Sequence, residues 1–260
     1  MSAVDERTVE RARGGDRAAL EALVRAVQDP IYALALRMLW HPADAEDATQ
    51  EILVRLVTRL ESFRGDAQFT TWAYRVAVNH LLTTRRRLAE RRAISFDEFG
   101  EDLAHGLDEP YDPQGVDEAL LAEEVKVGCT QAMLLCLDRE HRAAYVLGDV
   151  FELDSREAAY ALDVSPAAYR KRLQRARDRV KSFMEGHCGI VDPANPCRCR
   201  RRIGAAVAQG RVAPRALLFA RRGIADMERL HSAAAVMRSH PEARAPDRIM
   251  ELMRRTWLLR

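Results

Sequence analysis

The stretch from Phe151 to Lys181 reads FELDSREAAYALDVSPAAYRKRLQRARDRVK, and it predicts two helices joined by a tight turn. Asp154 is a suitable N-cap for the first helix, and Glu157 can close a capping box with it. Ser165 is a suitable N-cap for the second helix, where Pro166 fits the first helical position. A helix, a short turn and a second helix form the helix-turn-helix arrangement, whose second helix enters the major groove of DNA.

The second predicted helix carries a dense set of basic side chains around an apolar stripe. The basic residues are Arg170, Lys171, Arg172, Arg175, Arg177, Arg179 and Lys181. Arginine suits DNA recognition because its planar fork matches the edge of guanine and also binds phosphate. The alternative is a solvated surface helix rich in arginine. The two caps, the turn length and the charge asymmetry together favour DNA binding.

Charge is strongly segregated along the 260 residues, although the formal net charge is only +2. Residues 93–125 contain many acids and no lysine or arginine, whereas basic clusters lie at 85–87 and 198–202. Such blocks suggest that the basic parts contact nucleic acid and that the acidic part is a linker that DNA repels. The sequence shows no membrane span and no signal peptide, so we expect a cytoplasmic protein with reduced cysteines and no membrane insertion.

Apolar residues recur at helical spacing almost throughout, and this predicts an all-α fold. The first domain, residues 1–92, is expected to be helical, and residues 93–115 form an acidic linker with little structure of its own. Residues 116–184 form a second helical domain that ends in the helix-turn-helix, and residues 185–260 form a Cys-rich joint with a small helical extension. In the first domain we expect helices over 6–13, 17–27, 30–40, 44–60 and 67–92.

Segments in both predicted domains resemble bacterial RNA polymerase sigma factors of the extracytoplasmic-function type. In the first domain they are DAEDATQEILVRLV and LESFRGDAQFTTWAYRVAVNHLLTTRRR, and in the second LDREHRAAYVLGDVFELDSREAAYALDVSPAAYRKRLQRARDRV. The order of the segments and the acidic linker match the family as well. The resemblance implies a protein that binds core RNA polymerase and promoter DNA, melts the −10 element and initiates transcription. An anti-sigma protein is a further possible partner.

The resemblance assigns residues to three surfaces. Asp44, Asp47 and Glu51 share one helix face by their spacing, and the family binds polymerase through such a strip. The polymerase-binding residues are then Asp44, Glu46, Asp47, Gln50 and Glu51. The −10 residues are Arg75, Asn79, His80, Arg85, Arg86 and Arg87, with Trp72 expected in the core. The −35 residues are Ser165, Ala168, Tyr169, Arg170, Lys171, Arg172 and Arg175, with Tyr169 reaching a phosphate.

A separate cluster follows the basic helix in the segment HCGIVDPANPCRCRR. His187, Cys188, Cys197 and Cys199 could hold zinc tetrahedrally, although the C-x-C spacing is unusual. A thiol switch is an alternative, because neighbouring arginines would lower the pKa of the thiols, and so is the absence of any site. We expect Cys129 and Cys136 to lie in the core.

The rival function is a stand-alone helix-turn-helix regulator with a metal- or thiol-sensing extension. This function would give no role to the acidic strip of Asp44, Asp47 and Glu51 or to the −10 residues around Asn79. An enzyme is not expected, because the sequence has no Gly-rich phosphate loop, no H-E-x-x-H motif and no plausible nucleophile constellation, and no cofactor is required.

The apolar stripes of the extension, Leu217 to Met227 and Ile249 to Trp257, need a surface to cover them. We therefore expect the extension to regulate the rest of the chain.

Overall fold

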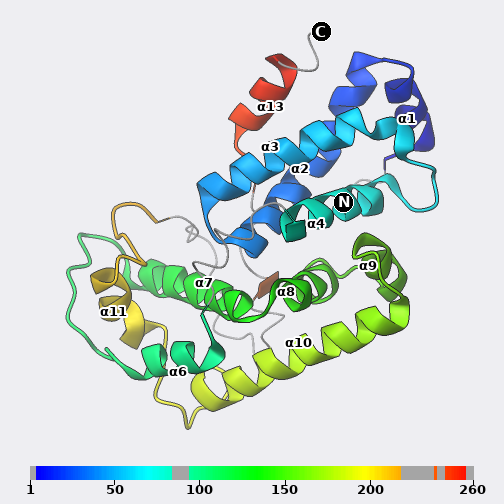
Figure 1. Cartoon of the computed structure of the whole chain (residues 1–260). Coiled ribbons are helices and arrows are strands. Elements are labelled where there is room, and N and C mark those ends of the chain that lie inside the picture. Colours follow the sequence, from blue (N-terminus) through cyan, green and yellow to red (C-terminus); the bar gives the residue numbers. More distant parts are fainter. Residues whose placement is uncertain (1–3, 84–93, 218–236, 239–243, 256–260) are drawn as a thin grey trace.

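The computed structural model describes residues 4–83, 94–217, 237–238 and 244–255. Within these ranges the chain is built from helices and their connections (Figure 1), as the all-α prediction requires. The N-terminal unit packs its helices against one another, with a 3-10 turn at Leu60–Ser62 between the last two. Its helices are α1 (Glu6–Arg13), α2 (Arg17–Leu39), α3 (Pro42–Thr58) and α4 (Phe69–Thr83).

The expected break before Pro30 is wrong, because α2 continues through this proline as one helix. Proline removes one intrahelical hydrogen bond and disfavours a helix interior. Here the residues on both sides of it are firmly packed: Val27 is 2% exposed, and Ile31 and Leu34 are fully buried. Tertiary packing therefore outweighs the local preference of the proline.

The expectation that residues 93–115 have little structure is also wrong. Phe96–Ala104 form helix α6, which Ser95 and Glu98 close at its start with a complete capping box. Phe99 and Leu103 are buried in the main core. Asp97, Glu98 and Glu101 of α6 are exposed, so part of the high charge of this segment lies on one side of a helix and not in a disordered linker.

The second unit holds the helix-turn-helix. It consists of α7 (Glu118–Cys136), α8 (Arg139–Tyr145) with a π-helical turn at Val146–Val150, α9 (Ser155–Ala161) and α10 (Pro166–His187). In Figure 1, α10 runs along the lower edge of the molecule beneath α8 and α9. Among the described helices, none combines the length and apolar character that a membrane crossing requires.

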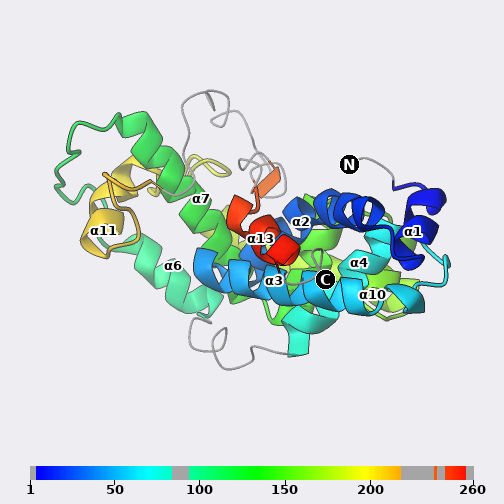
Figure 2. The same cartoon turned by 90° about the horizontal axis from the view of Figure 1, so that it is seen from above.

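The extension packs on both units. A 3-10 turn at Arg200–Arg202 leads into α11 (Ile203–Ala208), which buries Ile203 and Ala206 against Leu121 and Val125 of α7. Helix α13 (Asp247–Met253) lies on the N-terminal unit beside α3 (Figure 2). The stripe predicted to be apolar is buried through Ile249, Met250 and Met253, whereas Leu252 is 41% exposed. Thr256 and Trp257 lie outside the described residues.

One buried arginine joins the two units. Arg142 of α8 is 2% exposed. Its guanidinium donates to the carbonyl oxygens of Leu134 (2.7 Å), Leu135 (3.0 Å) and Leu137 (2.9 Å) at the end of α7, and to that of Met38 in α2 (2.6 Å). Burial lowers the pKa of Arg142 to about 10, so the side chain stays charged at neutral pH. The main core is continuous across this junction.

Replacing Arg142 with methionine should destabilise the protein by about 3 kcal/mol, because four buried carbonyl oxygens lose a hydrogen bond from a charged donor and each such loss is costly. Urea unfolding followed by circular dichroism measures this change. Arg170→Met is the matched control, since Arg170 is exposed on α10, and it should stay within about 0.5 kcal/mol of the wild type. Equal stability of the two variants would contradict the role assigned to Arg142.

Candidate nucleic-acid and partner surfaces

The helix-turn-helix forms through the predicted caps. The Asp154 carboxylate accepts from the backbone N–H of Arg156 (2.7 Å) and Glu157 (2.9 Å), and the Glu157 carboxylate accepts from the N–H of Asp154 (3.2 Å). The Ser165 hydroxyl oxygen accepts from the N–H of Ala168 (3.2 Å) and starts α10. Between the helices, Asp163 turns the chain with a φ of 55°, a conformation that aspartate tolerates better than most residues.

The basic side chains of α10 fall into two groups. Four of them pair with acids of the same unit while Arg177, Arg179 and Lys181 stay largely exposed: Arg172 with Glu140 (2.7 Å), Arg177 with Asp149 (2.9 Å), Arg179 with Asp138 (3.5 Å) and Lys181 with Glu185 (3.6 Å). Arg170, Lys171 and Arg175 are exposed, as are Ser165 and Ala168 at the start of the helix. These five residues lie at the start of α10 or in its N-terminal half, the part of a recognition helix that reaches base edges.

Tyr169 does not belong to this surface, so the prediction that it reaches a phosphate is wrong. The side chain is 1% exposed, and its hydroxyl donates to the carbonyl oxygen of Ala144 at 3.4 Å. It also lies against Gly148, where a Cβ atom would come within 2.2 Å of the tyrosine oxygen. Tyr169 therefore anchors α10 on α8, with glycine making room for its ring.

The acidic strip on α3 is partly open and partly covered. Asp47 and Glu51 are exposed, and Asp44 and Gln50 are half-buried. Glu46 differs, since it is only 8% exposed and pairs with Arg248 of α13. The predicted strip therefore exists on one helix, but its Glu46 carboxylate faces the extension in this structure.

The predicted −10 residues border a polar groove of about 380 Å³ on α4. Asn79 is exposed within it, whereas Trp72 is 6% exposed and packs against the rings of Phe63 and Phe69, as expected of a core residue. The groove is also lined by Arg55 and Arg59, which follow the acidic strip along the chain. These two arginines were missed by the sequence analysis; their i, i+4 spacing on a helix is the signal that could have found them.

Arg75 and His80 are less available than the sequence suggested. The Arg75 guanidinium binds the Asp163 carboxylate at 2.6 Å and lies 4.9 Å from the ring centre of Tyr160. His80 is 2% exposed, and its Nε2 lies 3.6 Å from the Glu51 carboxylate. His80 is therefore a buried wall beneath the groove and not an open phosphate contact. Arg85, Arg86 and Arg87 lie outside the described residues.

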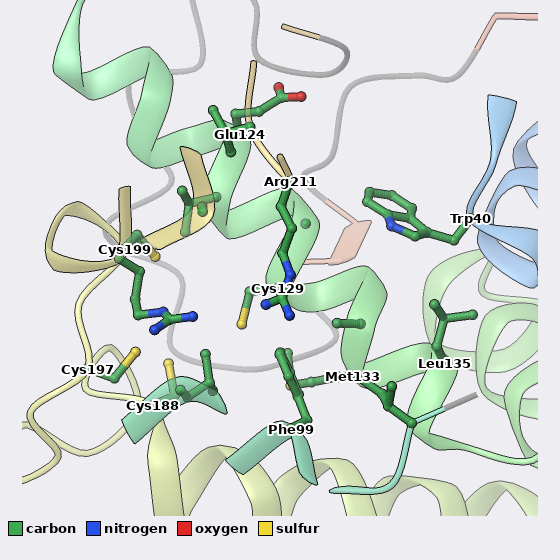
Figure 3. A pocket seen from close by; sticks show the side chains of 18 of the residues that line it. Trp40, Phe99, Glu124, Cys129, Met133, Leu135, Cys188, Cys197, Cys199 and Arg211 are labelled. Carbon is green, nitrogen blue, oxygen red and sulfur yellow. The ribbon is translucent and has the colours of Figure 1, made fainter. Parts of the chain in front are cut away.

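The cysteine cluster differs from the predicted set. Cys188, Cys197 and Cys199 line a cavity of about 490 Å³ together with Cys129 of α7 (Figure 3). His187 instead packs against the Phe183 ring, with ring centres 4.7 Å apart, and against Gly100 of α6. A Cβ atom at Gly100 would lie 2.7 Å from the imidazole. The structure therefore places His187 in a helix contact and brings Cys129 to the other thiols.

Burial raises the pKa of the Cys197 thiol, raises that of Cys199 to about 12, and raises that of Cys129 well above its ordinary value. The neighbouring thiols act in the same direction, because each disfavours a negative charge on the others. This is the opposite of the lowering expected from nearby arginines. Across the described ranges, no three histidine, cysteine, aspartate or glutamate side chains are already set around a common metal position.

The arginines near the cluster are bound by the acidic segment. Asp102 of α6 accepts from Arg202 (3.1 Å) and Arg211 (2.5 Å), and Asp108 pairs with Arg201 (2.6 Å). Burial by itself would raise the pKa of Asp102, but the guanidinium groups of Arg211 and Arg202 hold it below its ordinary value. Sequence analysis missed this docking site, although the spacing of Ser95 and Glu98 gives the signal of a capped helix.

Comparisons with known proteins match the two segments that contain the groove and the helix-turn-helix. The Sigma-70 region 2 model matches residues 23–91, and the Sigma-70 region 4 model matches residues 128–180. The RNA polymerase sigma-H factor of Pseudomonas aeruginosa is 30% identical over 185 residues, which cover 70% of this chain and 94% of the relative. The ECF RNA polymerase sigma-E factor of Escherichia coli K12 is 29% identical with the same coverage. The solved structure of CnrH in complex with the cytosolic domain of CnrY shares the fold, with a TM-score of 0.50 and 22% identity over 70% of this chain and 97% of CnrH.

Replacing Arg175 with alanine should weaken binding to a cognate DNA duplex by about 1–3 kcal/mol and relax the preference at one base pair, if the guanidinium reads a base. Tyr169→Phe should change affinity by less than about 0.5 kcal/mol, because the tyrosine hydroxyl faces the protein interior. Fluorescence anisotropy with duplexes selected from random sequence by the wild-type chain measures both. A large loss for Tyr169→Phe with none for Arg175→Ala would reverse the assignment.

Proposed function

The chain belongs to the extracytoplasmic-function group of RNA polymerase sigma factors, and from this premise we propose that its own contacts hold it in a closed form. As a sigma factor it binds core RNA polymerase and directs promoter recognition and transcription initiation. The observation that carries the proposal is a pair of internal ion pairs. Arg75 in the groove binds Asp163 of the helix-turn-helix, and Glu46 in the acidic strip binds Arg248 of the extension. Each pair covers a residue that a sigma factor presents to its partners.

In the open form, α3 docks on polymerase through Asp44, Asp47, Gln50 and Glu51, with Glu46 joining them when α13 leaves. The groove on α4 takes a base flipped from the −10 element: Asn79 pairs with its edge, and Arg55, Arg59 and Arg75 bind the adjoining backbone. Removing a base from the stack costs a few kcal/mol, so a pocket with an amide and several guanidinium groups suits the task. Helix α10 reads the −35 element through its exposed N-terminal half.

The helix-turn-helix closes over the first unit at α4 and α9. Beside the Arg75–Asp163 pair, the Thr71 hydroxyl donates to Glu157 at 3.4 Å, and the rings of Tyr74 and Phe151 lie 5.6 Å apart. The Arg75–Asp163 pair is partly exposed, with side-chain exposures of 32% and 65%, and such a pair contributes little by itself. This ion pair is therefore a minor part of what holds the closed form, and promoter DNA can compete for Arg75.

Helix α13 closes the polymerase side. Ile249, Met250 and Met253 are buried on the first unit. The N–H of Ala245 donates to Asp29 at 2.9 Å, and Arg254 pairs with Glu21 at 2.6 Å. These contacts place α13 next to α3, where polymerase would bind. The extension thus does within the chain what a separate anti-sigma protein would do, and such a protein remains a prediction.

Complete removal of residues 186–260 is a poor test of this regulation. It would uncover Leu121 and Val125, which are covered by Ile203 and Ala206. Substitutions that change a single surface give a clearer test than this deletion, and the structure suggests two of them. Co-purification with core polymerase also separates the sigma factor from a stand-alone regulator, which would leave α3 and the groove without a role.

Reversing Asp47 and Glu51 to lysine should abolish binding to core polymerase, because both carboxylates are exposed on the docking helix. Asp97→Lys with Glu101→Lys is the matched control: these exposed acids on α6 have the same i, i+4 spacing and the same change in charge. Both proteins should keep wild-type helical content by circular dichroism. Pull-down with core enzyme gives the readout, and full retention of binding by the α3 variant would refute the docking assignment.

Arg248→Glu should raise the affinity for core polymerase by about five-fold or more, since it replaces the Glu46 ion pair with repulsion and frees α3. Arg255→Glu changes an exposed charge in the residues directly after the same helix and should leave affinity near that of the wild type. Titration of labelled protein with core enzyme measures both. An Arg248→Glu protein that binds no more tightly than Arg255→Glu would show that α13 does not mask the polymerase surface.

A further inference from the structure

Four thiols from three separate parts of the chain line one cavity. Cys129 comes from the middle of α7, Cys188 caps the end of α10, and Cys197 and Cys199 come from the loop before α11. Figure 3 shows the four side chains gathered around the same space. We propose that Cys129, Cys188, Cys197 and Cys199 form a zinc site. This ligand set replaces the imidazole of His187 with a thiol that is 59 positions away from Cys188 in the chain.

The backbone brings two of these residues, Cys188 and Cys197, together independently of any ion. Cys188 and Cys197 form a parallel β-bridge, in which the N–H of Gly189 donates to the Cys197 carbonyl at 3.1 Å. Only glycine allows this approach, because a Cβ atom at position 189 would lie 2.4 Å from that carbonyl oxygen. The Asn195 amide closes the loop by donating to the Glu185 carbonyl at 2.9 Å. Adjacent backbone at the bridge puts the Cys188 and Cys197 side chains side by side.

The donor set selects the metal. Four thiolates suit a borderline or soft ion with tetrahedral geometry, which is the usual structural zinc arrangement, and they do not suit calcium or magnesium. The position of Cys129 in α7 is decisive, because it ties the loop to the helix that carries the second small core. A zinc ion would therefore join the end of α10, the loop and α7 at a single point.

Neutral thiols hold the loop only weakly, and the arginines beside the cavity are paired with an acid. Free thiols pack as small apolar groups and make only weak hydrogen bonds, so they give the loop little stability. Arg202 and Arg211, which also border the cavity, are bound to Asp102. The sulfurs line the cavity without already being set around a common metal position. Binding must therefore rotate the cysteine side chains and draw the loop onto α7, and this couples metal binding to local folding.

The experiment measures zinc in the full-length protein and does not depend on transcription. Protein purified under reducing conditions should contain about one zinc per chain by elemental analysis. After exchange to Co²⁺, the absorption spectrum should show thiolate-to-cobalt charge transfer and tetrahedral d–d bands. Competition with a chelator gives the zinc affinity, and circular dichroism checks that each variant is folded.

Two pairs of variants separate this site from the alternatives. Loss of a residue that hydrogen-bonds a metal ligand typically lowers metal affinity by roughly 10–100-fold. Cys129→Ser removes a ligand itself and should lower zinc affinity by more than this. Cys136→Ser on the same helix should leave zinc affinity unchanged. Cys199→Ser should also lose zinc, whereas His187→Gln should keep it. Loss of zinc in His187→Gln but not in Cys129→Ser would overturn the ligand set. A zinc-free wild-type protein, with free thiols or with a Cys188–Cys197 disulfide by mass spectrometry, would overturn the site itself.

Discussion

The guanidinium of Arg142 holds the ends of two helices that belong to different units. A buried cation normally requires an acid, yet Arg142 is surrounded by carbonyl oxygens at the C-terminal ends of α2 and α7. Helix ends carry unpaired carbonyls and the negative end of the helix dipole. Arg142 satisfies both requirements, because its planar fork reaches several acceptors at once. The closed arrangement, with α4 against α9, depends on this junction because it fixes where α8 and the helix-turn-helix lie relative to α2.

Charge has a different role in this molecule from the one suggested by its distribution along the sequence. The acidic stretch looks like a spacer that keeps DNA away, but Asp102 and Asp108 bind arginines of the extension. The arginines of α10 look like a single DNA-binding row, but Arg172, Arg177 and Arg179 are bound by acids of their own unit. Opposite charges that are remote in sequence are neighbours in space. The basic side chains that remain for DNA form a smaller set at the start of α10, and the ion pairs of the other arginines fix the orientation of the helix.

Local signals in the sequence predicted a large part of the fold. The caps at Asp154 and Ser165, the bounds of α1 and the burial of Trp72 all depend on residues within a few positions of one another. The failures arose where distant contacts decide the outcome: packing carries α2 through Pro30, and Ala144 and Gly148 enclose Tyr169. Cys129 could not be assigned to the thiol cluster from the sequence, because only the tertiary fold brings α7 close to residue 188 and no sequence spacing indicates it. The docking of α13 on α3 is of the same kind, since an apolar stripe predicts that a surface covers it but not which surface.

A regulated sigma factor needs contacts that are strong enough to hold the closed form and weak enough to yield. The ion pairs that cover Arg75 and Glu46 each have one well-exposed partner, Asp163 and Arg248, and exposed pairs contribute at most about 1 kcal/mol. The buried apolar residues of α13 contribute more, but the helix is short, so its total hold on α3 is limited. In the proposed mechanism, polymerase competes with α13 for Glu46 and displaces the helix. A metal ion at the thiol cluster would add stability to the joint that leads into the extension, and not to the displaced contacts themselves. The stability of the Cys-rich joint and the reversible docking of α13 on α3 can therefore be determined by separate parts of the extension.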